Sequence, residues 1–358
     1  MRLRLAEDEH EPELQRLTSE APMPGAFRLA YTREPDFRHG LGVQGTATQV
    51  ILAEEDGQAL GMAVRAILPL HVNGEIREVG YLGGLRTLAS ARRGLALARG
   101  FRFLRELHED GRVSGYLTTV LEANTHALAT LRSGRAGLPH YLDLGRFTTH
   151  VVLPNHRKGS SPRSCEVHRA TDLGWTETCA FIEREARRRP FGPVVDPRLE
   201  GPFYRGFRPD DLRVATRRGA IVGACGIWDQ SAYKQVRVAG YAPWLQALRP
   251  LLNAGLSLAG YPALPAPGAS LAPRTLAFTA VQEDDPEVLQ DLLRVVLAEA
   301  PTLLLVGLHE RDPLAVALRE WVTLPYPARL CWVCWDDGLE PFRGIDLTLA
   351  PVLELARL

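Results

Sequence analysis

The stretch from Glu78 to Phe103 constrains the fold of this chain more than any other part. It reads EVGYLGGLRTLASARRGLALARGFRF, an apolar glycine-rich run, a turn of small residues with two arginines, and then apolar residues at helical spacing. A helix that begins at such a turn has free backbone N–H groups, and its dipole and the arginines add positive potential. The pattern predicts a strand, a basic turn and a helix that can hold a phosphate group. An ordinary strand-to-helix connection with solvated arginines is the alternative interpretation.

The same residues resemble the acyl-CoA-binding motif of the GNAT acyltransferase superfamily, a strand followed by R/Q-x-x-G-x-G/A at the start of a helix. Gly94 and Ala96 stand at the fourth and sixth positions, whereas Ala91 stands where Arg or Gln is usual. The resemblance implies that backbone N–H groups of this loop hold the diphosphate of coenzyme A. The cofactor-binding residues it implies here are Arg86, Thr87, Leu88, Ala91, Arg92, Arg93, Gly94, Leu95 and Ala96.

A second stretch, Leu121 to Ala127, resembles another motif of the same family, a strand followed by N-x-x-A. The preceding residues are rich in β-formers, and Asn124 and Ala127 match the motif. Asn124 is also a good helix cap by its own chemistry. The two motifs lie about 30 residues apart, which is the spacing of one βαβ-like unit. In the family the pantetheine lies between the two motif strands, so Asn124 and Ala127 join the implied coenzyme A contacts.

The resemblance also directs attention to acid and base residues. The family often places a tyrosine four residues beyond the motif alanine, and this chain has Leu131 there. Tyr141 is the nearest substitute that could protonate the leaving thiolate, with an aromatic residue packed at a strand edge as the alternative. Attack by an amine needs a base, and Glu78 is the candidate, with Glu122 in reserve. Glu78 could equally be an edge-strand charge. The strand that ends at Leu88 would supply an N–H donor to the thioester oxygen.

The elements around the motifs follow the order of the GNAT family. Three strands are predicted over residues 50–54, 58–68 and 75–88, joined by Asp56–Gly57 and Asn73–Gly74. Both dipeptides are strong signals for hairpin turns. A strand, a helix and an irregular region are predicted before them, over residues 1–5, 9–19 and 21–45.

After a polar, basic linker this order begins again. Arg218 to Gly226 parallels Asp56 to Val64, and Leu303 to Val316 parallels Leu117 to Leu128. Tyr241 to Leu256 stands where the first motif would recur, and its prolines remove N–H donors. We therefore predict an α/β (α+β) protein of two tandem GNAT-like domains, the second degenerate, each a mixed, mostly antiparallel sheet flanked by helices. The predicted parts are an acyl-CoA-binding domain (1–153), a linker (154–164), the degenerate domain (165–340) and a C-terminal tail that packs on the domains (341–358).

Charge and hydropathy exclude several classes of partner. The 358 residues include 42 Lys and Arg and 42 Asp and Glu, so no global field recruits nucleic acid or an anionic membrane. The charged N-terminal stretch does not resemble a signal peptide, and the apolar windows are too short to cross a bilayer. We expect a cytoplasmic protein without nucleic-acid or membrane partners, and a homodimer stays open.

The cysteines do not form a disulfide or metal framework. Cys331-Trp-Val-Cys334 could be a redox pair or half of a zinc site. Its surroundings are typical of a strand, however, where positions three apart point to opposite faces, and a second Cys/His pair does not stand nearby. We predict buried strand cysteines and no metal.

The function that the resemblance implies is an acyl-CoA (acetyl-CoA) dependent N-acyltransferase acting on a small-molecule or peptide amine. Two alternatives stay open. Leu131 motivates a non-catalytic acyl-CoA-binding module that acts as a sensor or scaffold. The turn at Arg92–Gly94 would also suit a different α/β enzyme that holds another phosphate ligand. The sequence does not determine the acceptor or the length of the acyl chain.

Overall fold

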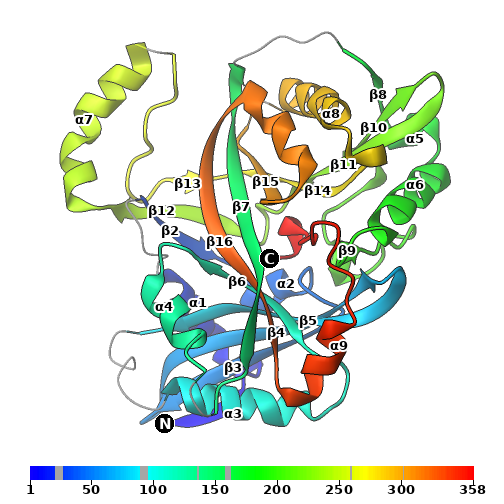
Figure 1. The fold of residues 1–358 in the computed structure, drawn as a ribbon. Coiled ribbons are helices and arrows are strands. Elements are labelled where there is room, and N and C mark those ends of the chain that lie inside the picture. Colours follow the sequence, from blue (N-terminus) through cyan, green and yellow to red (C-terminus); the bar gives the residue numbers. More distant parts are fainter. Residues whose placement is uncertain (21–26, 89–95, 135–136, 158–162, 259, 301) are drawn as a thin grey trace.

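The computed structural model describes residues 1–20, 27–88, 96–134, 137–157, 163–258, 260–300 and 302–358 (Figure 1). The first half of the chain contains β1 (Arg2–Leu5), α1 (Glu11–Glu20), β2 (Phe27–Thr32), α2 (Phe37–Leu41), β3 (Ala47–Glu55), β4 (Gln58–Val72), β5 (Glu75–Thr87), α3 (Ala96–His108), β6 (Tyr116–Leu121), α4 (Thr125–Leu131) and β7 (His140–Arg157). The second half contains β8 (Glu166–Arg169), α5 (Ala170–Leu173), α6 (Trp175–Arg187), β9 (Gly192–Pro193), β10 (Leu212–Arg217), β11 (Ala220–Asp229), β12 (Gln235–Tyr241), α7 (Pro243–Leu258), β13 (Ser270–Leu271), β14 (Arg274–Val281), α8 (Pro286–Glu299), β15 (Leu304–His309), the 3-10 helix η6 (Pro313–Glu320), β16 (Trp321–Cys334), α9 (Leu339–Arg343) and the 3-10 helix η8 (Leu355–Arg357).

Within this described part of the chain, thirteen strands form one continuous sheet. Its order is β1-β3-β4-β5-β6-β16-β7-β15-β14-β11-β10-β8, and β9 pairs with β4. Neighbouring strands are antiparallel except at β5–β6 and β14–β15, which are parallel. A smaller sheet joins β13, β12 and β2. The predicted α/β (α+β) class, with mixed, mostly antiparallel strands flanked by helices, is confirmed.

The hairpins predicted from Asp-Gly and Asn-Gly are present. The three predicted strands are β3, β4 and β5. Asp56 and Gly57 have φ angles of 50° and 75°, and Asn73 and Gly74 have φ angles of 54° and 79°. Positive φ at both turn residues is typical of the type I′ turn, whose twist matches that of the flanking strands.

The same β-bulge occurs at equivalent positions of both halves, which shows that the two halves share one arrangement of strands. Ala63 of β4 stands opposite two residues of β5, Gly84 and Leu85, because the register shifts there. Cys225 of β11 stands opposite Phe278 and Thr279 of β14 in the same way. The predicted parallel between the hairpin of residues 56–64 and that of residues 218–226 therefore holds residue for residue.

The two halves exchange their last strands. β16 of the second half lies between β6 and β7 of the first, and β7 lies between β16 and β15. Figure 1 shows this crossing as two long ribbons, orange and green, that run from one half into the other. Phe147 of β7 pairs with Ala328 of β16, and these two residues also pair with His309 of β15 and Leu121 of β6 respectively. Each half therefore depends on a strand of the other to complete its sheet.

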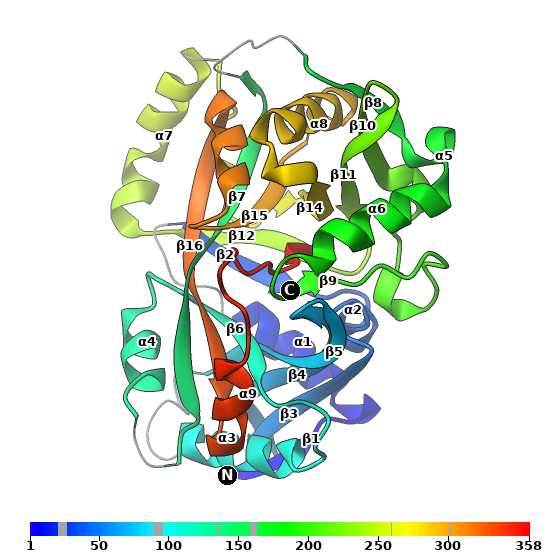
Figure 2. The ribbon, with the colours of Figure 1, turned by 45° about the vertical axis from the view of Figure 1, so that its right-hand side comes forward.

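Helices cover both faces of the sheet (Figure 2). In the first half, α1 and α2 pack on the face that carries Met62 and Val64, and α3 packs on the opposite face with Phe101. The corresponding places in the second half belong to α6 and α8. The region 21–45, predicted as irregular, contains β2 and α2. That prediction was wrong for these elements because β2 pairs with β12 of the second half, which is remote in sequence.

The residues after β16 return between the two halves. Leu353 and Leu355 belong to an apolar cluster with β4, β5 and β6, and Ala356 packs in the cluster around α6. Arg357 is 3% exposed, and its guanidinium lies 3.3 Å from the centroid of the Phe203 ring. This segment thus contacts the cores of both halves.

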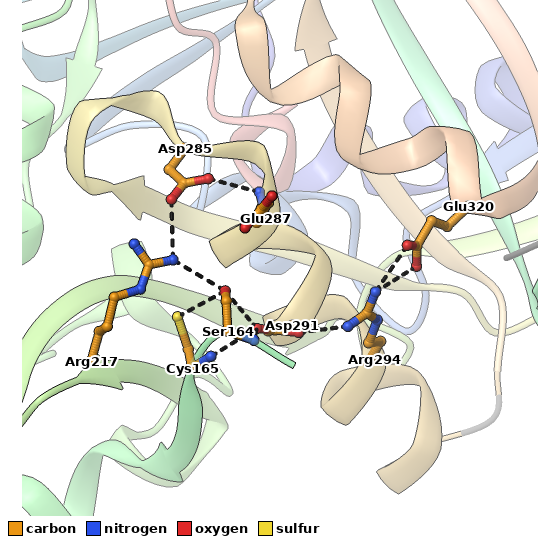
Figure 3. A network of polar contacts seen from close by, with 8 residues as sticks. All are labelled: Ser164, Cys165, Arg217, Asp285, Glu287, Asp291, Arg294 and Glu320. Atoms are coloured by element: carbon orange, nitrogen blue, oxygen red, sulfur yellow. Dashed lines mark hydrogen bonds and ion pairs between the residues drawn. The ribbon is translucent and has the colours of Figure 1, made fainter. Parts of the chain in front are cut away.

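A buried polar network fastens the beginning of the second half to α8 (Figure 3). Asp291 accepts hydrogen bonds from the Ser164 N–H (2.7 Å), the Ser164 hydroxyl (3.0 Å) and the Cys165 N–H (3.0 Å). Arg294 donates to Asp291 at 2.7 Å and to both Glu320 oxygens at 2.9 and 3.0 Å. The network joins three segments that lie far apart in sequence.

Candidate functional site

The parallel strands β5 and β6 separate part-way along their length. Their pairing ends at Leu82 and Thr118, and the described residues pair no further. β5 continues to Thr87, while β6 continues to Leu121 with its other edge paired to β16. We call the two diverging edges, Gly83–Thr87 and Thr119–Leu121, the β5–β6 fork. Because backbone groups at such edges need partners, the fork can pair with the amides of an extended ligand.

The β5 bulge lies inside this fork. Gly84 has a φ angle of 62°, and a Cβ there would stand 3.0 Å from Val64 Cγ2, so glycine suits both the backbone and the packing. A bulge sets two residues against one, which leaves a backbone group without a ladder partner. An amide at Gly84 or Leu85 is therefore positioned to donate to a ligand oxygen at the mouth of the fork.

The second half shows what such a bulge can bind. Phe278, the counterpart of Gly84, has a φ angle of 50°, and its N–H donates to Glu354 Oε2 at 2.7 Å. Glu354 Oε1 accepts from the Ala356 N–H at 3.2 Å, and burial raises the pKa of this carboxyl. The bulge amide of the second half thus holds a carboxylate oxygen from the chain's own C-terminal segment.

The loop that corresponds to the first motif in the second half is acidic. It connects β14 to α8 and reads Gln282-Glu283-Asp284-Asp285-Pro286. Its carboxylates would repel a diphosphate, and its proline lacks an N–H donor. The placement of this loop at Tyr241–Leu256 was wrong, because that segment forms the end of β12 and most of α7. The error arose because the β12–β13 region, which has no counterpart in the first half, interrupts the repeat between β11 and β14.

The structure describes only part of the predicted cofactor site. Residues 91–95, namely Ala91, Arg92, Arg93, Gly94 and Leu95, lie outside the described residues. Arg86 and Thr87 end β5 within the fork, and the Leu88 N–H donates to the Leu60 carbonyl at 2.9 Å. Ala96 begins α3. Asn124 caps α4, where its side chain accepts from the Ala127 N–H at 3.3 Å.

The candidate acid and base residues occupy three different environments. Glu78 lies six positions before Gly84, about 20 Å along an extended strand, and pairs with Arg112 at 2.7 Å. Glu78 therefore lies outside the fork. Glu122 directly follows β6 and adjoins the fork, and its Oε1 accepts from Arg146 at 2.8 Å. Burial raises the pKa of Tyr141, whose ring packs edge-on against Phe101 of α3 at 6.2 Å.

Sequence reasoning missed a basic and aromatic group beside the fork. Arg33 follows β2, Lys234 precedes β12, and Arg86 had been named only for its place on the motif strand. Burial, and secondarily the nearby Arg33, lowers the pKa of Lys234 to about 7, and burial lowers that of Arg33 to about 10. Burial also raises the pKa of Tyr31, which lies near Arg86. No local motif could reveal this group, because three distant segments contribute to it.

Replacing Lys234 by methionine is expected to flatten the pH dependence of the unfolding free energy between pH 7 and pH 10. The pKa of Lys234 falls from 10.5 to about 7 on folding, so in this window the unfolded chain holds more protons. The unfolding free energy of the natural protein therefore rises with pH, by at most about 1.4 kcal/mol per unit from this group. Urea unfolding at pH 7, 8 and 9 measures both slopes. Equal slopes would mean that Lys234 titrates normally.

Cys331 and Cys334 are free and buried in β16, as predicted, and burial raises the pKa of each thiol to about 11. Among the residues described, no group of three or more His, Cys, Asp or Glu side chains is arranged to hold a metal ion. In the same part of the chain no helix combines the length and apolar character needed to cross a membrane.

Comparison with known proteins gives similarity in structure alone. No family model matches the chain, and no curated protein matches it by sequence. The structure resembles Saccharomyces cerevisiae N-myristoyltransferase with bound myristoyl-CoA (TM-score 0.58, 11% identity, 98% of this chain and 85% of that chain). It also resembles a probable N-acyltransferase of Enterococcus faecalis V583 (TM-score 0.50, 8% identity, 92% and 72%).

A third similar structure is the GCN5-related glucosamine N-acetyltransferase region of a fungal multi-domain GH3 β-N-acetylglucosaminidase (TM-score 0.59, 10% identity, 92% of this chain and 38% of that chain). The first alignment spans nearly the whole chain and so includes both halves and the exchanged strands. At these identities the likeness concerns the fold. With the fork and the bulge in place, the chain has the fold of the GNAT superfamily, present twice in tandem.

Proposed function

We propose that this protein is an acyl-CoA-dependent N-acyltransferase whose first half binds the acyl-CoA and whose second half completes the acceptor site. The observation that carries the proposal is the contrast between the β-bulge at Gly84 and its counterpart at Phe278. In the second half a protein carboxylate occupies the bulge amide, since Phe278 N–H donates to Glu354. The described residues offer the bulge at Gly84 no such carboxylate, and the basic motif follows the same strand.

In this proposal the pantetheine lies in the β5–β6 fork and pairs with its backbone edges. The thioester oxygen accepts from the bulge amide, which is fixed before the reaction and stabilises negative charge as it develops. The acceptor amine attacks the thioester carbon, the C–S bond breaks, and coenzyme A leaves as the thiolate. The amine transfers its proton to water or to a base. Of the two carboxylates considered, Glu122 adjoins the fork and Glu78 does not.

One observation favours a second candidate, an acyl-CoA-binding module without turnover. Leu131 replaces the phenol that the family often uses to protonate the thiolate, and it is 6% exposed in the core beside α3. Tyr141 packs in the same core against Phe101, as an aromatic residue of structural importance would. A module of this kind would bind acyl-CoA with the same fork and loop.

Titration calorimetry with acetyl-CoA, a long-chain acyl-CoA, NAD and ATP tests the proposal. We expect binding of at least one acyl-CoA at one site per chain, because the second half lacks a basic loop. A thiol-release assay over a panel of amines then separates the enzyme from the binding module. Binding of NAD or ATP without binding of any acyl-CoA would contradict both candidates.

A further inference from the structure

Two arginines lie on the face of the sheet that α1 and α2 cover. Arg86 pairs with Met62 of β4, and directly opposed residues of neighbouring strands share a face, so Arg86 lies on the face covered by α1 and α2. Arg33 follows β2 on that same side, where its guanidinium donates to the Gly40 carbonyl at 2.5 Å. α3, the helix that follows the cofactor loop, covers the other face. The Arg86 side chain is thus on the side of the sheet away from α3.

The second half adds a third basic side chain to this place. Gln235 of β12 pairs with Thr32 of β2, so the next opposed positions are Lys234 and Arg33. Lys234 Nζ donates to the main-chain oxygen of Leu358 at 2.6 Å. The nearby charge of Arg33 contributes to the low pKa of Lys234, and that of Arg86 to the low pKa of Arg33.

The two guanidinium groups differ from most other partly buried arginines of the described residues. Within the described residues no ion pair joins Arg33 or Arg86 to a carboxylate, although most other partly buried arginines have one. Arg86 Nε is buried without a hydrogen-bond acceptor, and burial lowers the pKa of both arginines. A cation that is partly removed from water without a counter-charge destabilises the fold. The presence of both arginines beside a candidate site indicates that an anionic ligand pairs with them.

We propose that the acceptor of the reaction is a small amine that carries a carboxylate or phosphate group a few bonds from its amino group, and that Arg33 and Arg86 bind this anionic group. The inference rests on the proposed function. Arg86 follows the Gly84 bulge by two residues, about 7 Å along the strand. In the proposed function the thioester lies at the bulge. The span from Gly84 to Arg86 therefore sets the distance between the attacking nitrogen of the acceptor and its anionic group. The hydroxyls of Tyr31 on β2, near Arg86, and of Tyr81 on β5, near Arg33, can donate to the same group.

Steady-state kinetics of the full chain test this inference with paired acceptors. One arm compares amino acids with their amides, and the other compares an amino-sugar phosphate with the free amino sugar. In the natural protein we expect one pair to show a clear preference for its charged member, which also identifies carboxylate or phosphate as the anion. Equal kcat/KM for charged and neutral members of both pairs, with coenzyme A released, would overturn the inference and leave the proposed function intact.

The variants Arg33→Gln and Arg86→Gln locate the anion. A charge-assisted hydrogen bond contributes about 1.5–3 kcal/mol, so KM for the charged acceptor should rise about 10-fold to 100-fold. The KM for acyl-CoA should stay within about 3-fold of the natural value, because the fork holds the pantetheine through backbone groups and the Arg86 side chain lies on the face away from α3. Arg86→Lys should restore part of the acceptor affinity, and Arg319→Gln, an exposed arginine on η6, should change neither KM. A rise in the acyl-CoA KM alone would overturn the inference.

Thermal unfolding and direct binding measurements of the variants complete the test. Because each arginine is a partly buried cation with no counter-charge among the described residues, its neutral variant should unfold at the same or a higher temperature than the natural protein, which a purely structural role would not produce. If no amine is turned over, calorimetry with the charged acceptors still tests the inference. Binding to the natural protein that is lost in Arg86→Gln supports the inference. Absence of binding to the natural protein overturns it. Absence of acyl-CoA binding, measured separately, would instead refute the proposed function.

Discussion

Replacing Gly94 by glutamate is expected to abolish acyl-CoA binding while leaving the fold intact. The resemblance places Gly94 at the fourth position of the loop that holds the diphosphate, where a side chain adds bulk and a carboxylate adds negative charge. Two close negative groups repel, so the loss should exceed about 100-fold in Kd, or about 2.7 kcal/mol. Titration calorimetry with acyl-CoA measures the binding, and circular dichroism measures the fold.

A matched control for this variant lies on the helix that follows the loop. Gly100 of α3 would carry a Cβ with no heavy atom within 4 Å, so Gly100→Glu makes the same chemical change in open space. We expect Gly100→Glu to keep the natural Kd within about 3-fold, because an exposed charge more than a turn away is screened. Undiminished affinity in Gly94→Glu would show that the diphosphate is not held by this loop.

Replacing Asp291 by alanine is expected to destabilise the protein by about 3–5 kcal/mol, the usual cost of breaking a buried ion pair by removing one partner. Asp291 is 1% exposed and is the acceptor for the Ser164 N–H, the Ser164 hydroxyl and the Cys165 N–H (Figure 3). Its removal takes this acceptor away from the Ser164 and Cys165 N–H groups and leaves Arg294 with Glu320 alone. Urea unfolding followed by circular dichroism measures the difference in free energy.

Glu287→Ala provides the control for the stability measurement. Glu287 lies in the first turn of the same helix, α8, and is exposed to solvent. Substitutions at such surface positions usually change the unfolding free energy by less than about 0.5 kcal/mol. If Asp291→Ala were as mild as Glu287→Ala, the network would not fasten the second half to α8.

Local sequence patterns predicted the local structure of this chain. The dipeptides Asp56–Gly57 and Asn73–Gly74 require a tight turn with positive φ, so they located the meander of β3, β4 and β5 without tertiary information. Asn124 located the beginning of α4, because its side chain can accept from a backbone N–H two or three residues on. The parallel between the β3–β4 and β10–β11 hairpins was likewise readable, since it is a repeat of residue types at fixed spacing.

The site was less predictable because its parts come together only on folding. Glu78 was chosen for its strand, yet it lies six positions before the bulge at Gly84, and the fork begins only after Leu82. Arg33 and Lys234 carry no motif, and they meet only because β2 pairs with β12 of the other half.

The sequence by itself therefore determined the hairpins, the helix caps, the repeat and the family resemblance, all of which depend on residues close together in the chain. Only the tertiary structure decided the exchange of β7 and β16 and the hydrogen bond from the Phe278 bulge amide to Glu354. It alone also brought Arg33 and Arg86 together beside the β5–β6 fork. The physical reason is that strand pairing and charge burial depend on contacts between segments remote in sequence, and nothing in the local pattern of either segment specifies its partner.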